Sequence, residues 1–311
     1  MNNKSVAVLG SYVADLAFRI DRLPTWGETR MGQSFNLGPG GKGSNQAVAA
    51  ARAGANVAFI TKLGKDAFGD IARSLYHAEG IDTQYIFTSP NPTGAAAILI
   101  DAAKGENAII VVPGACFELN PAEVDQATDR IAASSIFVTQ LELSLPTVEH
   151  GLRLAHTHGV PTVLNPAPAT TLPDSIYPLC DYLTPNETEA AALTGIPVTD
   201  LASAEKAATA LLALGVRNVI LTLGAQGALI KNYALTRHIP AVDAGAIVET
   251  TGAGDAFNGG LATALAEGMD LVEATKFACA VAGISVTRPG TAPSMPHRAE
   301  IDALRADKTK P

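Results

Sequence analysis

The chain has 311 residues, of which 47% are apolar and 17% charged, so it can bury the core of one large or two modest domains. A net charge of −8 and the lack of a Lys/Arg cluster argue against nucleic acid or an anionic membrane surface as a partner. Three widely spaced cysteines, a first strand-like run that begins at residue 5 and apolar runs too short to span a bilayer lead us to expect a cytoplasmic protein.

From the N-terminus onward, short β-branched runs alternate with Ala- and Leu-rich stretches. This alternation predicts an α/β fold with a mainly parallel sheet covered by helices on both faces. The predicted strands are residues 5–10, 56–61, 135–140, 161–165, 181–184 and 217–223. The predicted helices are residues 44–53, 67–79, 121–133, 146–158, 187–194, 203–214, 254–267 and 271–287.

Two stretches, residues 13–37 and 93–112, interrupt this alternation. Each consists of two strand-like runs joined by a polar turn, in the first case through "PTWGE". The pattern alone is equally consistent with a lid over a site and with an ordinary extension of the sheet. We expect Trp26, in the first turn, to pack within this inserted structure, and the alternative is a sugar-stacking or dimer contact.

Several predicted strands end in polar residues or glycine, and in a parallel sheet such ends form one ligand-binding edge. These ends are Ser11 to Asp15, Lys62, Gln140 with Glu142, Asn165, Asn186, and Thr222 with Gly224. The sequence therefore predicts a polar rim with a ligand on it. Lys62 is expected to be a solvated member of that rim rather than a catalytic one.

The first glycine cluster, "GPGGKGSNQ" at residues 38–46, has the letters of a dinucleotide-binding loop without its context. It does not follow the first buried strand directly, no acidic residue ends the next strand, and Gly43 stands after Lys42 where a P-loop has Ser or Thr. The cluster instead predicts close backbone approach and then a helix, with Ser44 as N-cap and Lys42 and Asn45 as polar side chains. Polar side chains at such a helix start suit a neutral polyhydroxy ligand as well as a phosphate. The alternative is that the loop serves only for packing.

The second glycine cluster, "ETTGAGDAFNGG" at residues 249–260, leads into an Ala-rich predicted helix. Successive N–H groups of Gly252, Ala253 and Gly254 at a helix N-terminus predict an anion cradle. A carboxylate there, Asp255, would repel phosphate unless it acts as a general base on an attacking hydroxyl. The alternative is that Asp255 only caps the helix.

Together the clusters resemble the two signatures of the ribokinase (PfkB-type) carbohydrate kinases, in "GGKGSNQAVAAARAG" (40–54) and "TTGAGDAF" (250–257). The segments "NPAPA" (165–169), "TPNETEA" (184–190), "LTLGAQG" (221–227) and "SVTRPGTAPSMP" (285–296) agree as well, so the resemblance runs from about residue 5 to 305. It implies a ribokinase-like three-layer αβα sandwich with a mainly parallel central sheet. Residues 1–311 would form one kinase domain, with 13–37 and 93–112 inserted as a small β-sheet lid through which two subunits form a homodimer.

The resemblance further implies transfer of the ATP γ-phosphoryl group, with Mg²⁺ on the phosphates, to the C5 hydroxyl of a pentose, D-ribose first. By position it assigns the sugar to Asp15, Gly41, Lys42, Asn45, Glu142 and Asp255, the base to Asp255, and the anion hole to Gly252, Ala253 and Gly254. It assigns ATP to Asn186, Thr222, Gly224, Gly227 and Gly254, places Glu189 near Mg²⁺, and puts Cys279 near the adenine pocket, where we expect it to pack. A monovalent cation such as K⁺ is assigned to Glu249, Thr251, Ser285, Arg288, Gly290 and Ser294, mostly through backbone carbonyls.

Two positions depart from the family pattern. Val13 stands where the family usually has Asn, and an apolar side chain cannot pair with a sugar hydroxyl. A kinase for 2-deoxyribose, another sugar or a nucleoside therefore remains an alternative. Glu249 stands where the cation site usually has Asp, which leaves activation by K⁺ open. A sugar-binding protein without catalysis is a more remote alternative, because Asp255 and the glycines are retained.

Overall fold

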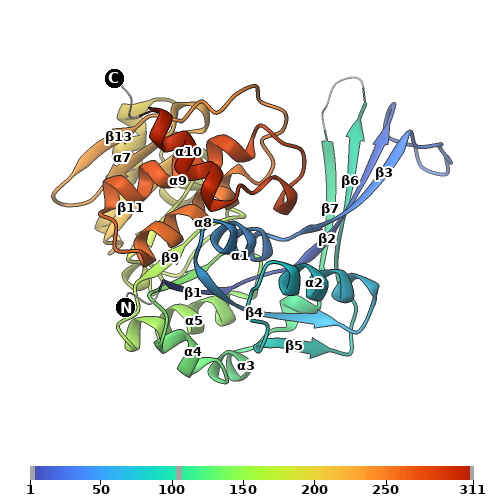
Figure 1. The fold of residues 1–311 in the computed structure, drawn as a ribbon, viewed down its shortest axis with the longest axis horizontal. Helices are drawn as coiled ribbons and strands as arrows, with labels where there is room; N and C mark the ends of the chain where they lie inside the picture. Colours follow the sequence, from blue (N-terminus) through green and yellow to red (C-terminus); the bar gives the residue numbers. More distant parts are fainter. Residues whose placement is uncertain (1–3, 103–106, 309–311) are drawn as a thin grey trace.

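A nine-stranded sheet forms the centre of the structure, a computed structural model that describes residues 4–102 and 107–308 (Figure 1). The strand order is β13-β12-β11-β10-β9-β8-β1-β4-β5. The strands are β1 (Ser5–Leu9), β4 (Asn56–Gly64), β5 (Ile86–Ser89), β8 (Ile136–Thr139), β9 (Thr162–Leu164), β10 (Tyr182–Leu183), β11 (Asn218–Thr222), β12 (Ala228–Lys231) and β13 (Thr236–Ile239). All neighbours from β11 to β5 are parallel, and β12 and β13 add antiparallel pairs at one edge. The predicted mainly parallel sheet is confirmed.

Helices cover both faces of this sheet. Because side chains alternate along a strand, Val6 and Val8 of β1 join the apolar cluster of α1, α2, α8 and α9, while Ala7 and Leu9 join that of α5 and α7. The helices are α1 (Lys42–Arg52), α2 (Ala67–Ala78), α3 (Pro121–Asp125), α4 (Thr128–Ala132), α5 (Leu145–Thr157), α6 (Glu187–Thr194), α7 (Leu201–Ala213), α8 (Ala253–Ala266), α9 (Leu271–Ser285) and α10 (Arg298–Lys308). The predicted three-layer αβα sandwich is confirmed.

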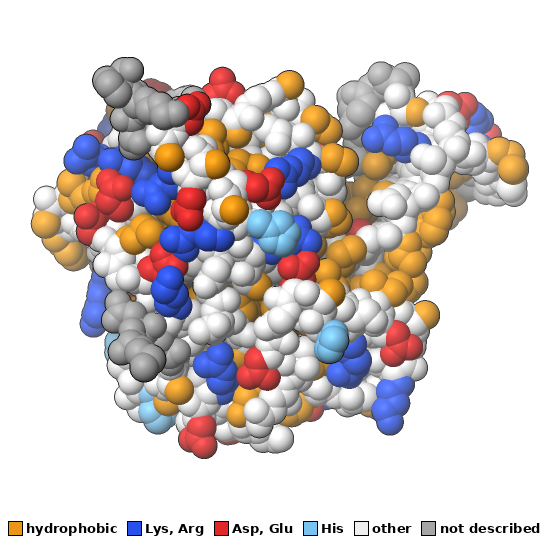
Figure 2. All heavy atoms as spheres, in the orientation of Figure 1, with side chains coloured by type: hydrophobic (Ala, Val, Ile, Leu, Met, Phe, Trp, Pro, Cys, Tyr) orange, Lys and Arg blue, Asp and Glu red, His pale blue; other side chains and the backbone are white. Residues whose placement is uncertain are grey.

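The two inserted stretches come together in a second, four-stranded sheet, which we call the small sheet. Its order is β3-β2-β6-β7, with β2 (Val13–Ile20), β3 (Ser34–Gly40), β6 (Thr93–Asp101) and β7 (Asn107–Gly114). The central pair, β2 and β6, is parallel, although its strands come from different insertions. The small sheet projects from the body, and a hollow edged by apolar side chains lies between the two (Figures 1 and 2).

The observed helices differ from the predicted ones at two places. The helix expected at 121–133 is two short helices, α3 and α4. At the break, the Thr128 hydroxyl donates to the Asp125 carbonyl at 2.6 Å, a local side-chain bond that competes with the helical backbone pattern. The prediction of Ser44 as N-cap is wrong, because α1 begins two residues earlier, at Lys42, with Gly41 as N-cap. Ser44 is buried inside the first turn, where its N–H donates to the Ser11 carbonyl at 2.9 Å.

Three features were not predicted from the sequence: β5, the antiparallel hairpin of β12 and β13, and α10. Each strand has four residues, too few to establish a period, and α10 is rich in charged residues. Among the described residues, none of the helices is both long and apolar enough to cross a bilayer.

Candidate active site

Glycines at the start of α1 allow the helix to lie against the segment that follows β1. Gly41 has a φ of 86°, which favours glycine, and a Cβ there would lie 2.8 Å from the backbone nitrogen of Val13. A Cβ on Gly43 would lie 2.6 Å from the backbone of Gly10. The first glycine cluster is therefore a close-packed helix start, which brings the first turn of α1 to the edge where β1 ends.

The second glycine cluster forms the N-terminus of α8. Gly252, with a φ of 82°, is its N-cap, and the Ala253 N–H donates to the Thr250 carbonyl at 3.2 Å. The next N–H groups, those of Gly254 and Asp255, belong to the first turn, where a helix leaves its amides without intrahelical partners. A Cβ on Gly254 would meet no atom within 4 Å. This helix start thus offers amide donors and open space to an anion, with the Ala253 amide already engaged.

Asp255 lies between α8 and α1 and is only 6% exposed. Its Oδ2 accepts a hydrogen bond from Asn45 Nδ2 at 2.9 Å, and its Oδ1 accepts one from Gln46 Nε2 at 3.0 Å. Burial raises the pKa of Asp255, whereas the charge of Lys42 and the two amide hydrogen bonds lower it. The carboxylate is therefore held in one orientation with an elevated pKa, as a general base requires.

The other end of the Asn45 amide is an acceptor without a partner. Its Oδ1 is buried, and no donor in the described part of the chain hydrogen-bonds to it. Because an unpaired buried acceptor costs about 1–3 kcal/mol, this oxygen requires a donor from outside the protein chain. A ligand hydroxyl beside Asp255 would supply that donor.

Glu142, which follows β8, is fixed by donors from two other segments. Its Oε2 accepts hydrogen bonds from the Lys42 N–H, at 2.8 Å, and from the hydroxyl of Ser11. Ser11 follows β1, the neighbour of β8, so the two strand ends bring it to the carboxylate. The sequence indicated Ser11 only as part of a polar rim, and the structure shows that it orients Glu142.

Acidic groups outnumber basic ones at this edge. Burial raises the pKa of Asp15 to about 6, and neighbouring carboxylates, Glu142 first, add to the shift. Burial alone would lower the pKa of Lys42, but Asp255, Glu142 and Glu189 raise it above its usual value. The ammonium group of Lys42 is thus the one cation in this set of charges. The four carboxylates that can accept hydrogen bonds are those of Asp15, Glu142, Glu189 and Asp255. Such a site suits a neutral ligand rich in hydroxyl groups better than a bare phosphate.

The residues predicted to bind ATP lie further along the edge, after β10 and β11. Asn186 caps α6: its side chain accepts from the Glu189 N–H at 2.8 Å, and both Glu189 oxygens accept from Asn186. Asn186 also forms a parallel bridge with Thr222, the last residue of β11. Gly224 and Gly227 flank the next turn with φ values of 52° and 94°, and a Cβ on Gly227 would lie 2.1 Å from the backbone of β13.

Cys279 packs within α9, as expected. It is 4% exposed, and burial raises the pKa of its thiol to about 12. The thiol is therefore protonated and unreactive at neutral pH.

The residues assigned to a monovalent cation come from the chain before α8 and after α9. The two segments are joined by a hydrogen bond from the Gly290 N–H to Glu249 Oε2 at 2.9 Å. Ser285 and Ser294 are buried, Arg288 is half-buried beside Glu300, and Thr251 is exposed. Within residues 4–102 and 107–308, no three His, Cys, Asp or Glu side chains gather in a way that could hold a metal ion. A cation at this loop would thus depend on backbone carbonyls and Glu249.

Two side chains differ from expectation. Lys62 is not solvated: it pairs with Glu123 at 2.8 Å, and its side chain is 11% exposed, because α3 lies over the end of β4. Trp26 is fully exposed and does not pack within its own chain. Gln46 had not been singled out from the sequence, where its one signal is that it follows Asn45.

The raised pKa of Asp15 predicts a stability change with a defined pH window. The protonated form stabilises the fold fully below the usual value of 3.8, and this contribution is lost as pH rises through the folded value of about 6. Asp15→Asn stays neutral, so we expect it to melt above wild type near pH 8, with a gap that narrows toward pH 4. Melting curves across this range test it, with exposed Asp129→Asn as the control. Equal melting near pH 8 would contradict the prediction.

Known proteins resemble this chain over nearly its whole length. The sequence pattern of the pfkB family carbohydrate kinases matches residues 3–298. Ribokinase of Haemophilus influenzae is 44% identical over 298 residues, which cover 96% of this chain and 97% of that protein. Deoxyribokinase of Salmonella typhi is 38% identical over 292 residues, which cover 94% of this chain and 95% of that protein.

The fold agrees with that of a solved relative. The structure of Arabidopsis thaliana ribokinase complexed with ribose and ATP has a TM-score of 0.92 and 31% identity to this chain. The match covers 96% of this chain and 97% of that one. This chain therefore belongs to the pfkB family of carbohydrate kinases, and it is an ATP-dependent sugar kinase.

Proposed function

We propose that this enzyme transfers the γ-phosphoryl group of ATP to the C5 hydroxyl of a pentose, with Asp255 as general base. The pairing of Asp255 with Asn45 carries the proposal, since a buried carboxylate adjoins a buried acceptor that lacks a donor. Relatives named as ribokinase and deoxyribokinase support a pentose as the acceptor. The chain would act as one kinase domain, with the small sheet as its lid.

The sugar would lie between the small sheet and the start of α1. Asp15, on β2, reaches over the first glycine cluster, since a Cβ on Gly40 would lie 2.3 Å from its carboxylate. Asp15 and Glu142 would accept hydrogen bonds from sugar hydroxyls, and Asn45 Oδ1 would accept another. Lys42 would donate, and Gly41 would allow the sugar to approach the backbone.

The transfer itself needs positioning and neutralisation of charge. As the sugar hydroxyl attacks the γ-phosphorus, its proton passes to Asp255, the new oxygen–phosphorus bond forms and the bond to the ADP oxygen breaks. The N–H groups of Gly252 and Gly254 would face the charge on the phosphoryl oxygens, and that of Ala253 would join them once it leaves the Thr250 carbonyl.

Mg²⁺ bound with ATP would neutralise charge on the phosphates. Both Glu189 oxygens already accept hydrogen bonds from Asn186, so these residues fit an indirect role through metal-bound water. Thr222, Gly224 and Gly227 would lie along the adenine nucleotide.

Asp255→Asn tests the base. The variant keeps the shape of the side chain but cannot take the proton, so turnover should fall at least ~100-fold. Sugar and ATP affinity, measured by calorimetry, should change little. Turnover near that of wild type would contradict the role of Asp255.

Val13 favours a second candidate acceptor, 2-deoxyribose. Val13 begins β2 between Gly40 of β3 and Gly94 of β6 and is 4% exposed. A sugar hydroxyl placed against it would lose its hydrogen bond to water and gain none, which costs about 1–3 kcal/mol. A sugar without that hydroxyl avoids this cost.

We therefore expect kcat/KM for D-ribose to exceed that for 2-deoxyribose by less than ~100-fold, since strong discrimination needs a site that hydrogen-bonds the hydroxyl. Val13→Asn should increase the ratio. Hexoses and nucleosides measured in the same assay would show whether the acceptor is a pentose at all. A larger ribose preference in wild type would mean that another group pairs with the hydroxyl.

We further propose a monovalent-cation site at the loop of Glu249 and Gly290, in which one oxygen of Glu249 is already engaged. Carbonyls and a carboxylate are the hard oxygen ligands that K⁺ prefers, but one Glu249 oxygen is tied to the Gly290 N–H. Glu249→Asp would withdraw the carboxylate from that bond. We expect the ratio of kcat in K⁺ to kcat in tetramethylammonium to be larger for this variant than for wild type, and equal ratios would show that the carboxylate does not serve a cation.

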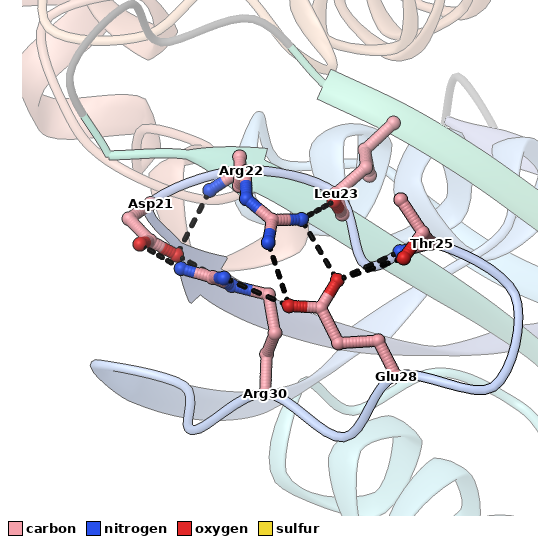
Figure 3. A network of polar contacts seen from close by, with 6 residues as sticks. All are labelled: Asp21, Arg22, Leu23, Thr25, Glu28 and Arg30. Atoms are coloured by element: carbon pink, nitrogen blue, oxygen red, sulfur yellow. Dashed lines mark hydrogen bonds and ion pairs between the residues drawn. The ribbon is translucent and has the colours of Figure 1, made fainter.

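The turn between β2 and β3, at the tip of the small sheet, is held by a network of hydrogen bonds and ion pairs (Figure 3). Glu28 accepts hydrogen bonds from Arg22, from Arg30 and from the Thr25 N–H, and Arg30 also pairs with Asp21. The hydrogen bonds, that of Arg22 first, hold the pKa of Glu28 well below its usual range. Trp26, within this turn, is fully exposed.

We propose that this surface joins two copies of the chain. Further exposed apolar side chains of the small sheet are Leu23, Met31, Phe35, Ile109, Ile110, Val111 and Val112. So many exposed apolar side chains on one small sheet are typical of an interface. Sedimentation should give twice the mass of the chain, and the double variant Trp26→Ser, Ile110→Ser should lower it, whereas a wild-type monomer would contradict the proposal.

A further inference from the structure

Gln46 contacts Asp255 as Asn45 does, but all the hydrogen-bonding atoms of its amide are engaged. It is 1% exposed on α1, and its Nε2 donates to Asp255 Oδ1 and to Asn165 Oδ1, each at 3.0 Å. Its Oε1 accepts from Gln140 Nε2 at 2.7 Å. Asn45 keeps a buried oxygen without a partner, whereas Gln46 keeps no atom for a ligand. The two neighbours on one helix are therefore suited to different tasks.

A backbone carbonyl fixes the direction of this amide chain. Asn165 Nδ2 donates to the carbonyl oxygen of Thr184 at 3.2 Å, and a carbonyl can only accept. The Oδ1 of Asn165 must then face Gln46, so the amino end of Gln46 must face both Asn165 and Asp255. The oxygen of Gln46 is left for Gln140. A reversed amide at residue 46 would set oxygen against oxygen at two contacts.

We propose that Gln46 is a positioning residue for the phosphoryl-transfer step, which holds Oδ1 of Asp255 throughout and leaves Oδ2 to take the proton. The proposal rests on Asp255 being the base. Gln140 and Asn165, at the ends of β8 and β9, hold Gln46 in turn. When a sugar arrives, Asn45 can turn from Oδ2 to the ligand while the carboxylate stays in place.

The hydrogen bond from Gln46 also favours the ionised form of Asp255. The groups that interact with this carboxylate are Asn45, Gln46 and the charges of Lys42, Glu142, Asp15 and Glu189. The four charged groups are unaltered by a change at residue 46. Loss of the Gln46 donor should thus move the acid limb of the rate profile to higher pH, whereas a change in packing alone would not.

Gln46→Met tests the proposal, because methionine has nearly the same length and no donor. The single-turnover rate of transfer, measured across pH, isolates the chemical step from product release. We expect a loss of ~10-fold or more at neutral pH, with the acid limb displaced upward and a smaller effect on sugar KM. A rate within about twofold of wild type and an unmoved acid limb would overturn the proposal.

A double-mutant cycle separates positioning from general damage. On an Asp255→Asn background there is no carboxylate to hold, so Gln46→Met should cost little more. A loss that persists in full on that background would overturn the proposal. If Asp255→Asn itself turns over normally, the base assignment fails instead, and the two failures remain distinguishable.

If Gln46→Met does not fold, variants of residues near Gln46 still test the proposal. Gln140→Met removes the group that engages the oxygen of Gln46 and should move the acid limb in the same direction by less. Thr139→Val is the matched control: it precedes Gln140 on β8, is fully buried, and its hydroxyl has no hydrogen-bond partner among the described residues. Its profile should equal that of wild type, and a Gln140→Met profile identical to this control would overturn the proposal.

Discussion

Asp255 can be buried because helix α1 lies close enough to helix α8 for two of its amides to reach the carboxylate. The approach depends on Gly259, where a Cβ would lie 2.5 Å from Ala49 Cβ and 2.8 Å from the Gln46 carbonyl. At the other side of α1, Gly43 permits equally close contact with the end of β1. A carboxylate removed from water without such donors would be protonated at neutral pH. The rest of the site is arranged around this contact.

The two glycine clusters serve opposite charges. The first places α1 among carboxylates, where hydroxyl groups can donate and a phosphate would be repelled. The second presents the amides of a helix start, where negative charge is favoured. In the proposed arrangement a sugar and a nucleotide would therefore have separate places on one edge of the sheet, with Asp255 between them. The first cluster matches a dinucleotide loop in its letters because both need glycine for close approach.

The sequence was sufficient for the parallel sheet and its two helical layers, and it indicated most residues of the candidate site, because period and glycine clusters are local signals. It was insufficient where a role depends on tertiary contact. Nothing in the run of α1 distinguishes Gln46 from an ordinary polar residue, and Lys62 looked solvated because its partner, Glu123, is remote in sequence. The prediction for Trp26 is wrong for another reason: its position in a turn between strand-like runs suggested packing, but no part of its own chain covers it.

Several polar groups of the site lack a full set of partners within the described part of the chain, and a ligand hydroxyl would supply one. Asp15 and Asp255 have raised pKa values, and Asn45 holds a buried acceptor without a donor. A hydroxyl donor from a ligand would stabilise each of these groups. Gln46 differs from these groups, because all the polar atoms of its side chain form hydrogen bonds within the protein. The distinction separates the groups proposed to bind the substrate from the group proposed to hold the Asp255 carboxylate, and it rests on which hydrogen bonds the protein completes by itself.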